Sequence, residues 1–285
     1  MNQDQKTPDS SLKTRIRSAL VLAPVVLVIL WFGGFGFTLM MAAACAIGIH
    51  EWSRMVLSQE QAKAKGIEYL AGAAGALAVL VTGMVYSAVV SLWLLLAMCF
   101  LVFAYNFSQG GGSLRRLLLG VIYIGFSVSV MVWLRNGTVD GLYHTMTLLL
   151  IVWASDSFAY FSGRAIGGPK LAPTISPKKT WAGFWGSSLG AGLVAGGMAC
   201  PWLVDILGVT PLGGMSFIGY FVMGFILAMF GQVGDLFISL IKRHYGVKDT
   251  GNIIPGHGGI LDRIDALLLV ALVFGAVAAA TGIQG

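Results

Sequence analysis

Apolar residues gather in long runs along this chain, and short polar segments separate the runs. A helix needs about 20 apolar residues to cross the roughly 30 Å hydrocarbon core of a bilayer, and somewhat fewer where the bilayer is thin. The runs that approach this length are 18–33, 35–50, 69–85, 87–105, 115–134, 142–161, 182–205, 215–241 and 260–282. The pattern predicts an all-α, polytopic membrane protein with about nine transmembrane helices, although the two short runs at the start also fit one hairpin that dips into the bilayer.

The composition supports this interpretation. Hydrophobic residues make up 57% of the chain and charged residues only 11%, whereas about a quarter of the residues in a soluble domain are charged. We expect a polar tail over residues 1–17, N-terminal helices over 18–110, and a catalytic region over 111–285. Two polar loops interrupt this last region, at 162–181 and 242–260.

The basic residues predict which helix ends face the cytoplasm, because Lys and Arg accumulate in short cytoplasmic loops. With nine spans and the N-terminus inside, 17 of the 18 Lys and Arg residues fall in cytoplasmic segments and only Arg135 falls outside. We therefore expect a protein of the cell inner membrane whose polar loops face the cytoplasm and whose C-terminus lies outside. The net charge of +6 reflects this topology and attraction to anionic lipids, so membrane lipids are expected partners and nucleic acid is not.

Two patterns within the apolar runs predict helix packing. Glycine pairs at a spacing of four, Gly186/Gly190 and Gly192/Gly196, are typical of helices that approach closely in a bilayer. The cysteines all lie within apolar runs and predict packing residues rather than a disulfide framework. They are Cys45, Cys99 and Cys200.

Carboxylates at membrane depth are costly and therefore mark candidate functional positions. The four concerned are Asp156, Asp235, Asp262 and Asp265. At 1.5 Å per residue, Asp156 lies about 21 Å from the outer end of its run and Asp235 about 30 Å from the outer end of its own. Because Asp262 and Asp265 open the last run from the cytoplasmic side, all four fall in the inner-leaflet half.

A polar stripe follows the run at 215–241. Its members recur every three or four residues and so share one helix face, which should line a cavity. They are Gln232, Asp235, Ser239 and Lys242. In the alternative interpretation, Lys242 merely neutralises Asp235, and Asp262 and Asp265 only complement a helix dipole. His50 and Glu51, at the end of the second run, are interpreted as a pair at the membrane interface rather than as part of a functional site.

The loop at 162–181 is suited to phosphate. It is rich in glycine and ends in Ser176-Pro177-Lys178-Lys179-Thr180, just before the run at 182–205. Glycines let backbone N–H groups approach phosphate oxygens, lysines neutralise their charge, and a helix N-terminus adds a favourable dipole. The two lysines have a simpler alternative as a mark of the cytoplasmic side.

The acidic residues favour a hard cation. Mg²⁺ takes carboxylate oxygens and shares its remaining positions with water and substrate phosphates. Asp235 and Asp262 suit this role, whereas His244 and His257 stand on either side of a glycine-rich loop and make zinc a poor candidate. The chain has no Walker A sequence, so a nucleotide would be held by other means.

The stretch Ser239–Asp265 resembles the signature of the phosphatidate cytidylyltransferases, or CDP-diacylglycerol synthases. It contains S-x-x-K-R, K-D, H-G-G and D-R-x-D in that order. The segments Ser155–Tyr160 and Ser176–Gly183 resemble the same family, so the resemblance covers the C-terminal half of the chain. It implies transfer of a cytidylyl group from CTP to phosphatidic acid with Mg²⁺, in which the lipid phosphate itself attacks and no Ser or Cys nucleophile is needed.

The resemblance implies roles for individual residues. Direct metal ligands are Asp235 and Asp262, supported by Asp156 or Asp265, and a second cation is left open. Neutralisation of the CTP phosphates falls to Lys178, Lys179, Lys248 and Arg263, and contact with the lipid phosphate to Lys242 and Arg243. The catalytic set is Asp235, Asp262, Lys248 and Arg263. Further substrate contacts are expected from Ser176, Ser239, His257, Gly258 and Gly259, with His257 as a hydrogen-bond donor in the glycine turn.

Other functions fit parts of the pattern. A secondary transporter could use Asp156 and Asp235 as a cation or proton relay. A CTP-dependent lipid kinase could use similar nucleotide contacts, but it would transfer the γ-phosphoryl group and release CDP. A membrane scaffold is disfavoured because it has no need of so many costly charges. A homodimer is also left open.

Overall fold

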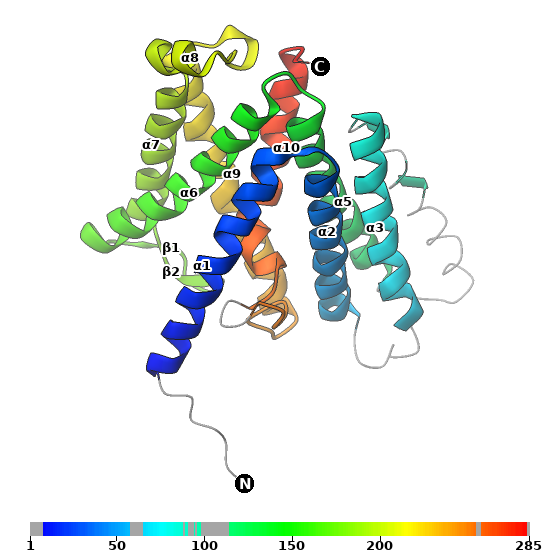
Figure 1. Ribbon diagram of the computed structural model, residues 1–285. Helices are drawn as coiled ribbons and strands as arrows, with labels where there is room; N and C mark the ends of the chain where they lie inside the picture. The colour runs from blue at the N-terminus through cyan, green and yellow to red at the C-terminus, as the bar shows by residue number, and fades with distance from the viewer. Residues whose placement is uncertain are drawn as a thin grey trace.

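The computed structural model describes residues 8–57, 65–87, 89–90, 94, 96–97, 114–254 and 258–283. These residues form a bundle of helices with one small antiparallel sheet (Figure 1). The helices are α1 (Pro8–Phe32), α2 (Gly34–Val56), α3 (Lys65–Val85), α5 (Leu114–Asn136), α6 (Gly141–Ala165), α7 (Trp181–Met198), α8 (Pro201–Leu207), α9 (Phe217–His244) and α10 (Leu261–Ala280). The strands are β1 (Lys170–Ala172) and β2 (Ser176–Thr180). A helix pairs its own backbone N–H and C=O groups, which is why apolar runs become helices in hydrocarbon. The all-α membrane prediction is confirmed.

Within the described part of the chain, five helices are long and apolar enough to cross a membrane: α2, α5, α6, α9 and α10. A sixth crossing is formed if α7 and α8 count together, although they are bent by 52°. The predicted run 182–205 is thus two helices rather than one, with Pro201 in the first turn of α8, where its missing N–H costs nothing. The apolar parts of α1 and α3 are shorter, and 87–105 lies largely outside the described residues, so the count of nine stays a prediction.

The path of the chain places the two predicted polar loops together. In Figure 1, α1 starts at the lower end of the bundle and α10 finishes at the upper end. The hairpin between α6 and α7 and the connection between α9 and α10 both lie in the lower half of the view, where α1 begins. This arrangement is compatible with an odd number of crossings.

Close packing joins α7 to its neighbours α6 and α9. A Cβ atom on Gly190 would overlap the ring of Phe158 on α6, and one on Gly192 would lie 2.9 Å from the carbonyl oxygen of Phe221 on α9. The predicted role of these glycines in helix contacts is confirmed, because no larger residue fits at either separation. The result is a three-helix unit that carries the hairpin at one end.

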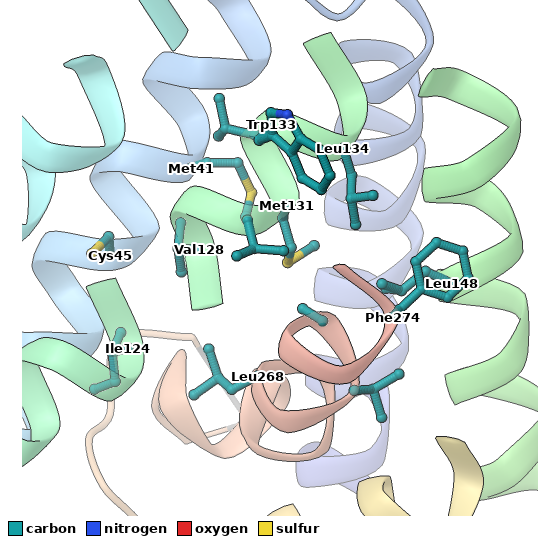
Figure 2. Packing of buried hydrophobic residues seen from close by; sticks show 14 of the residues in the cluster. Met41, Cys45, Ile124, Val128, Met131, Trp133, Leu134, Leu148, Leu268 and Phe274 are labelled. Carbon is teal, nitrogen blue, oxygen red and sulfur yellow. The ribbon is translucent and has the colours of Figure 1, made fainter. Parts of the chain in front are cut away.

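The apolar core lies around α5. Figure 2 shows Ile124, Val128 and Met131 of α5 near Cys45 of α2 and Leu268 of α10, all of them buried. Cys45 is therefore a packing residue, as predicted, and Cys45 and Cys200 are both free thiols. The prediction for Cys99 lies outside the described residues.

Arg135, the one basic residue expected outside, holds the C-terminal end of α1 by hydrogen bonds. Its Nε and Nη2 atoms donate to the carbonyl oxygens of Leu30 and Trp31, each at 2.7 Å. These carbonyls end α1 and have no partner within the helix, so a cation there satisfies them and complements the helix dipole. Asn136 beside it accepts a hydrogen bond from the backbone N–H of Gly34 at 2.9 Å, and the two residues together hold the turn between α1 and α2.

Candidate functional site

The hairpin after α6 delivers two lysines to the start of α7. Strand β2 pairs antiparallel with β1, and its last residue, Thr180, caps α7 by accepting the backbone N–H of Gly183 at 3.1 Å. Lys178 is exposed and Lys179 half-buried, with Ser176 at the start of the strand. The predicted phosphate-suited loop therefore contains a hairpin, and it leads into a helix N-terminus as expected.

Lys179 reaches the polar stripe of α9. Its Nζ lies 2.6 Å from Oδ2 of Asp235, and Ser239 donates to Oδ1 of the same carboxylate at 3.2 Å. The alternative in which Lys242 neutralises Asp235 is therefore wrong. The side chains of Lys179 and Asp235 are 19% and 33% exposed, and the Nζ atom of Lys179 is itself buried. The ion pair is therefore partly buried.

Asp262 is held more firmly, at the start of α10. Its Oδ1 receives Nζ of Lys242 at 2.8 Å, and its side chain is only 4% exposed. Its Oδ2 accepts the backbone N–H groups of Thr250 at 2.9 Å and Gly259 at 3.1 Å. Gly258 has a φ of +86°, and a Cβ there would lie 3.0 Å from Oδ2 of Asp262. Asp262 thus gathers the glycine turn, the loop after α9 and Lys242 into one unit.

A residue that the sequence analysis did not place in the site completes this unit. Glu51 at the C-terminal end of α2 is only 2% exposed. Its carboxylate accepts the hydroxyl of Thr250 at 2.9 Å and the backbone N–H groups of Ile260 at 3.0 Å and Leu261 at 2.9 Å. These N–H groups belong to the first turn of α10, which has no helical partners for them and carries partial positive charge. Glu51 therefore holds the loop against the bundle and is not a surface charge.

The sequence did carry one signal for Glu51. An acid at the end of an apolar helix is costly to bury unless its oxygens are hydrogen-bonded. Its partners, however, lie about two hundred positions further along the chain, so nothing local to the second run identified them.

Acids from three helices surround Lys179. Asp156 of α6 interacts electrostatically with Asp235, Lys179 and Arg263. Asp265 of α10 interacts with Asp235 and Lys179, and also with Lys242. The structure thus brings Asp156, Asp235 and Asp265 within electrostatic reach of one half-buried lysine, whereas Asp262 lies with its own set of donors.

Backbone contact between α9 and α10 produces this convergence. A Cβ on Gly234 would lie 3.0 Å from the carbonyl oxygen of Asp265 and 3.1 Å from Cβ of Leu269. The absent side chain lets the two helices approach at the level of Asp235. Two carboxylates on separate helices are thereby placed within electrostatic reach of each other.

The remaining predicted site residues lie in the last turn of α9 and in the loop that follows it. Arg243 donates to the carbonyl oxygens of Ile175 at 3.5 Å and Val247 at 3.3 Å, so it ties this loop to the turn of the hairpin. Lys248 is exposed in the loop. The prediction for His257 lies outside the described residues.

The donor set suits a hard cation in its chemistry. Carboxylate oxygens are the ligands that Mg²⁺ and Ca²⁺ prefer, and three carboxylates lie within electrostatic reach of one lysine in this cluster. Over the residues that the structure describes, no three His, Cys, Asp or Glu side chains are arranged to hold a metal by themselves. A cation here would take its other ligands from water and substrate phosphates, as Mg²⁺ commonly does.

Comparison with known proteins adds an independent finding. A profile described as "Cytidylyltransferase family" matches residues 13–280. A phosphatidate cytidylyltransferase of Brucella abortus biovar 1 (strain 9-941) is 38% identical over 273 residues, which cover 94% of each chain. A phosphatidate cytidylyltransferase of Rickettsia bellii (strain RML369-C) is 41% identical over 162 residues, which cover 56% of this chain and 67% of that relative. The similarity extends through the N-terminal helices as well as the candidate site.

Proposed function

Since the chain belongs to the cytidylyltransferase family, we propose that it transfers the cytidylyl group of CTP to phosphatidic acid, which yields CDP-diacylglycerol and pyrophosphate. One structural observation carries this proposal. Carboxylates from α6, α9 and α10 and cations from β2, α9 and α10 meet at one end of a membrane bundle. Such alternating charge is suited to two anionic substrates that must be brought together despite their repulsion.

The transfer needs little covalent chemistry from the protein. An oxygen of the lipid phosphate attacks the α-phosphorus of CTP and forms the new P–O bond. The bond from the α-phosphorus to the oxygen that bridges to the β-phosphate breaks, and pyrophosphate leaves with the electron pair. Because the attacking oxygen is already anionic, neither a nucleophilic side chain nor a strong base is required. Catalysis then rests on positioning and charge neutralisation.

The hairpin is suited to the triphosphate. Lys178 is exposed and Lys179 is half-buried in an ion pair with Asp235, and both lie next to the N-terminus of α7, where N–H groups favour anions. Arg263, exposed at the start of α10, would add a further cation beside Asp156. Lys242 is engaged with Asp262 at 2.8 Å, which supports a positioning role for this lysine in place of contact with the lipid phosphate.

We assign Mg²⁺ to the acidic cluster. Asp235, Asp156 and Asp265 would hold it, because Asp235 lies within electrostatic reach of both other acids, while both oxygens of Asp262 already accept hydrogen bonds. When bound, the cation would neutralise charge on the phosphate oxygens of the substrates. The side chains of this protein would fix its position, and Lys179 would move from Asp235 to a phosphate.

The site is proposed to face the cytoplasm from an inner membrane. The count of basic residues supports this orientation, because 17 of 18 fall on the side of the two polar loops when the N-terminus is inside. CTP would then reach the cluster from water, and the lipid headgroup would reach it from the inner leaflet.

The proposal is tested with purified protein in detergent micelles supplied with phosphatidic acid, Mg²⁺ and CTP labelled at the α-phosphate. We expect label in the lipid and release of pyrophosphate. An unlabelled lipid product with all of the label in released CDP, together with transfer of label when the γ-phosphate of CTP is labelled instead, would identify a lipid kinase. Movement of a solute across liposomes with no consumption of CTP would identify a transporter.

A pair of variants tests the acidic cluster. Asp235→Asn removes the charge that faces Lys179 and should reduce turnover by about a hundredfold or more, as loss of a transition-state electrostatic contact does. Asp205→Asn is the matched control, because Asp205 is exposed on α8 at the opposite end of the bundle. Full turnover by Asp235→Asn would reject the role assigned to this carboxylate.

A further inference from the structure

An apolar cavity of about 540 Å³ lies between α1, α2, α5, α6 and α10. Its lining includes Leu22, Val26 and Leu30 of α1, Met40 and Ala44 of α2, and Leu267 of α10. In Figure 1, α1 crosses in front of α10, and residues of both helices line the cavity. The volume falls within the range of about 300–1,000 Å³ that is typical of ligand pockets.

The cavity is lined from Arg263 at the start of α10 to Phe37 near the start of α2 and Thr145 near the start of α6. Its lining extends from Leu22 to Leu30 along α1 and from Ile260 to Leu268 along α10, and at 1.5 Å per residue each stretch covers about 12 Å. With the N-terminus inside, Phe37 and Thr145 lie near the outer ends of their runs and Arg263 lies near the inner end of its own. A chain that enters from the site end would therefore extend along the bundle past the middle of the membrane.

The charged residue in the lining, Arg263, lies at the end of the cavity near the site. Arg263 borders the cavity and also interacts with Asp156 of the acidic cluster. Thr145, another polar lining residue, donates its hydroxyl to the carbonyl oxygen of Gly141 within its own helix and so offers no free donor. The cavity thus has an apolar body and one cationic lining residue, Arg263, at the end near the acidic and basic cluster.

We propose that this cavity holds one acyl chain of the lipid acceptor, with the anionic headgroup of that lipid beside Arg263. The inference rests on the proposed function for the identity of the lipid and extends it by placing one chain inside the protein. An amphiphile with an anionic head and an apolar tail matches a cavity with one cationic end and an apolar body. The acceptor is therefore selected by its chain as well as by its phosphate.

Filling the cavity tests the proposal. Ala44 lines the cavity on α2, and Ala44→Phe places a ring inside it, whereas Ala276→Phe places the same ring on an exposed face of α10. We expect Ala44→Phe to raise the KM for dipalmitoyl phosphatidic acid about tenfold or more, the scale on which hydrophobic pockets discriminate. The KM for CTP and turnover with dihexanoyl phosphatidic acid should stay as in the wild type, and Ala276→Phe should change neither. An equal effect on both lipids, or no effect, would overturn the proposal.

A labelling experiment that needs no turnover separates this inference from the proposed function. Phosphatidic acid with a diazirine at the end of one chain should label peptides of α1, α2 and α10 in the absence of CTP, and Ala44→Phe should abolish this. Phosphatidylcholine with the same chain should label them weakly, and equal labelling would indicate a structural lipid and overturn the assignment to the acceptor. Specific labelling by a wild type that transfers no cytidylyl group would overturn the proposed function and leave an anionic lipid in the cavity.

Discussion

Glu51 offers the sharpest test of how the site is held, because it lies in the N-terminal half of the chain and supports a loop in the C-terminal half. Its buried carboxylate accepts three hydrogen bonds, from the Thr250 hydroxyl and from the N–H groups of Ile260 and Leu261. The perturbation is Glu51→Gln, which keeps the shape of the side chain and removes its charge. Oε2 receives two of the bonds and Oε1 the third.

The geometry sets the size of the effect. A Gln whose oxygen takes the place of Oε2 must turn its NH₂ group toward the N–H of Ile260, so one bond becomes a contact between two donors. A hydrogen bond to a charged group contributes about 1.5–3 kcal/mol, and a buried donor left without a partner costs about 1–3 kcal/mol. We expect Glu51→Gln to lower the free energy of unfolding by about 3 kcal/mol, because these terms describe the same lost contact and do not add fully.

The assay has two readouts. Thermal unfolding in detergent should shift the Tm down by about 6–12 °C, at about 2–4 °C per kcal/mol. Cytidylyl transfer, measured below the unfolding range, should fall further than stability alone explains, because Thr250 also donates to Asp262 and the loop supports both carboxylates.

The control lies two positions along the same helix. Ser53 is fully buried, and its hydroxyl donates only to the carbonyl oxygen of Ile49, at 2.6 Å. Ser53→Ala should change stability by less than about 1 kcal/mol, since it removes a bond within the helix. If Glu51→Gln melts and turns over like Ser53→Ala, the carboxylate does not hold the loop and the reasoning is refuted.

Three further substitutions test separate contacts. Gly234→Val should destabilise the protein by about 1–3 kcal/mol, because a Cβ there would lie 3.0 Å from the backbone of α10. Its control is Gly36→Val, at a position with open space around it, which should leave the Tm within about a degree or two of the wild type. Thr180→Ala removes the cap of α7 and should cost about 1 kcal/mol, visible as a small drop in Tm with the hairpin still present. Lys242→Met leaves the carboxylate of Asp262 buried without its cation and should lower the free energy of unfolding by about 3–5 kcal/mol. The double variant with Asp262→Asn should regain part of this stability in a thermal melt. No recovery in the double variant would contradict a direct coupling between Lys242 and Asp262.

Much of the architecture follows from the order of the residues alone. In lipid, an apolar run has no alternative to a helix because its backbone groups find no water, so the bounds of α6, α9 and α10 lie within a few residues of the predicted runs. The stripe of α9 is likewise a matter of helix periodicity, and its residues Gln232, Ser239 and Lys242 are buried in the bundle. The stretch Ser239–Asp265 is contiguous, which is why the pairing of Lys242 with Asp262 falls within one recognisable segment.

The partners of the charges were decided only in three dimensions. Asp235 shares a helix face with Lys242, yet it pairs with Lys179 from a hairpin 56 positions earlier. Glu51 pairs with a loop about two hundred positions later, and the cavity beneath α1 joins five helices from both halves of the chain. A period of 3.6 residues determines which side chains share a face of a helix. Lipid solvates every apolar face equally well, so the hydrophobic pattern does not select which helix packs against which face. That choice depends on details of packing, such as the missing side chain of Gly234.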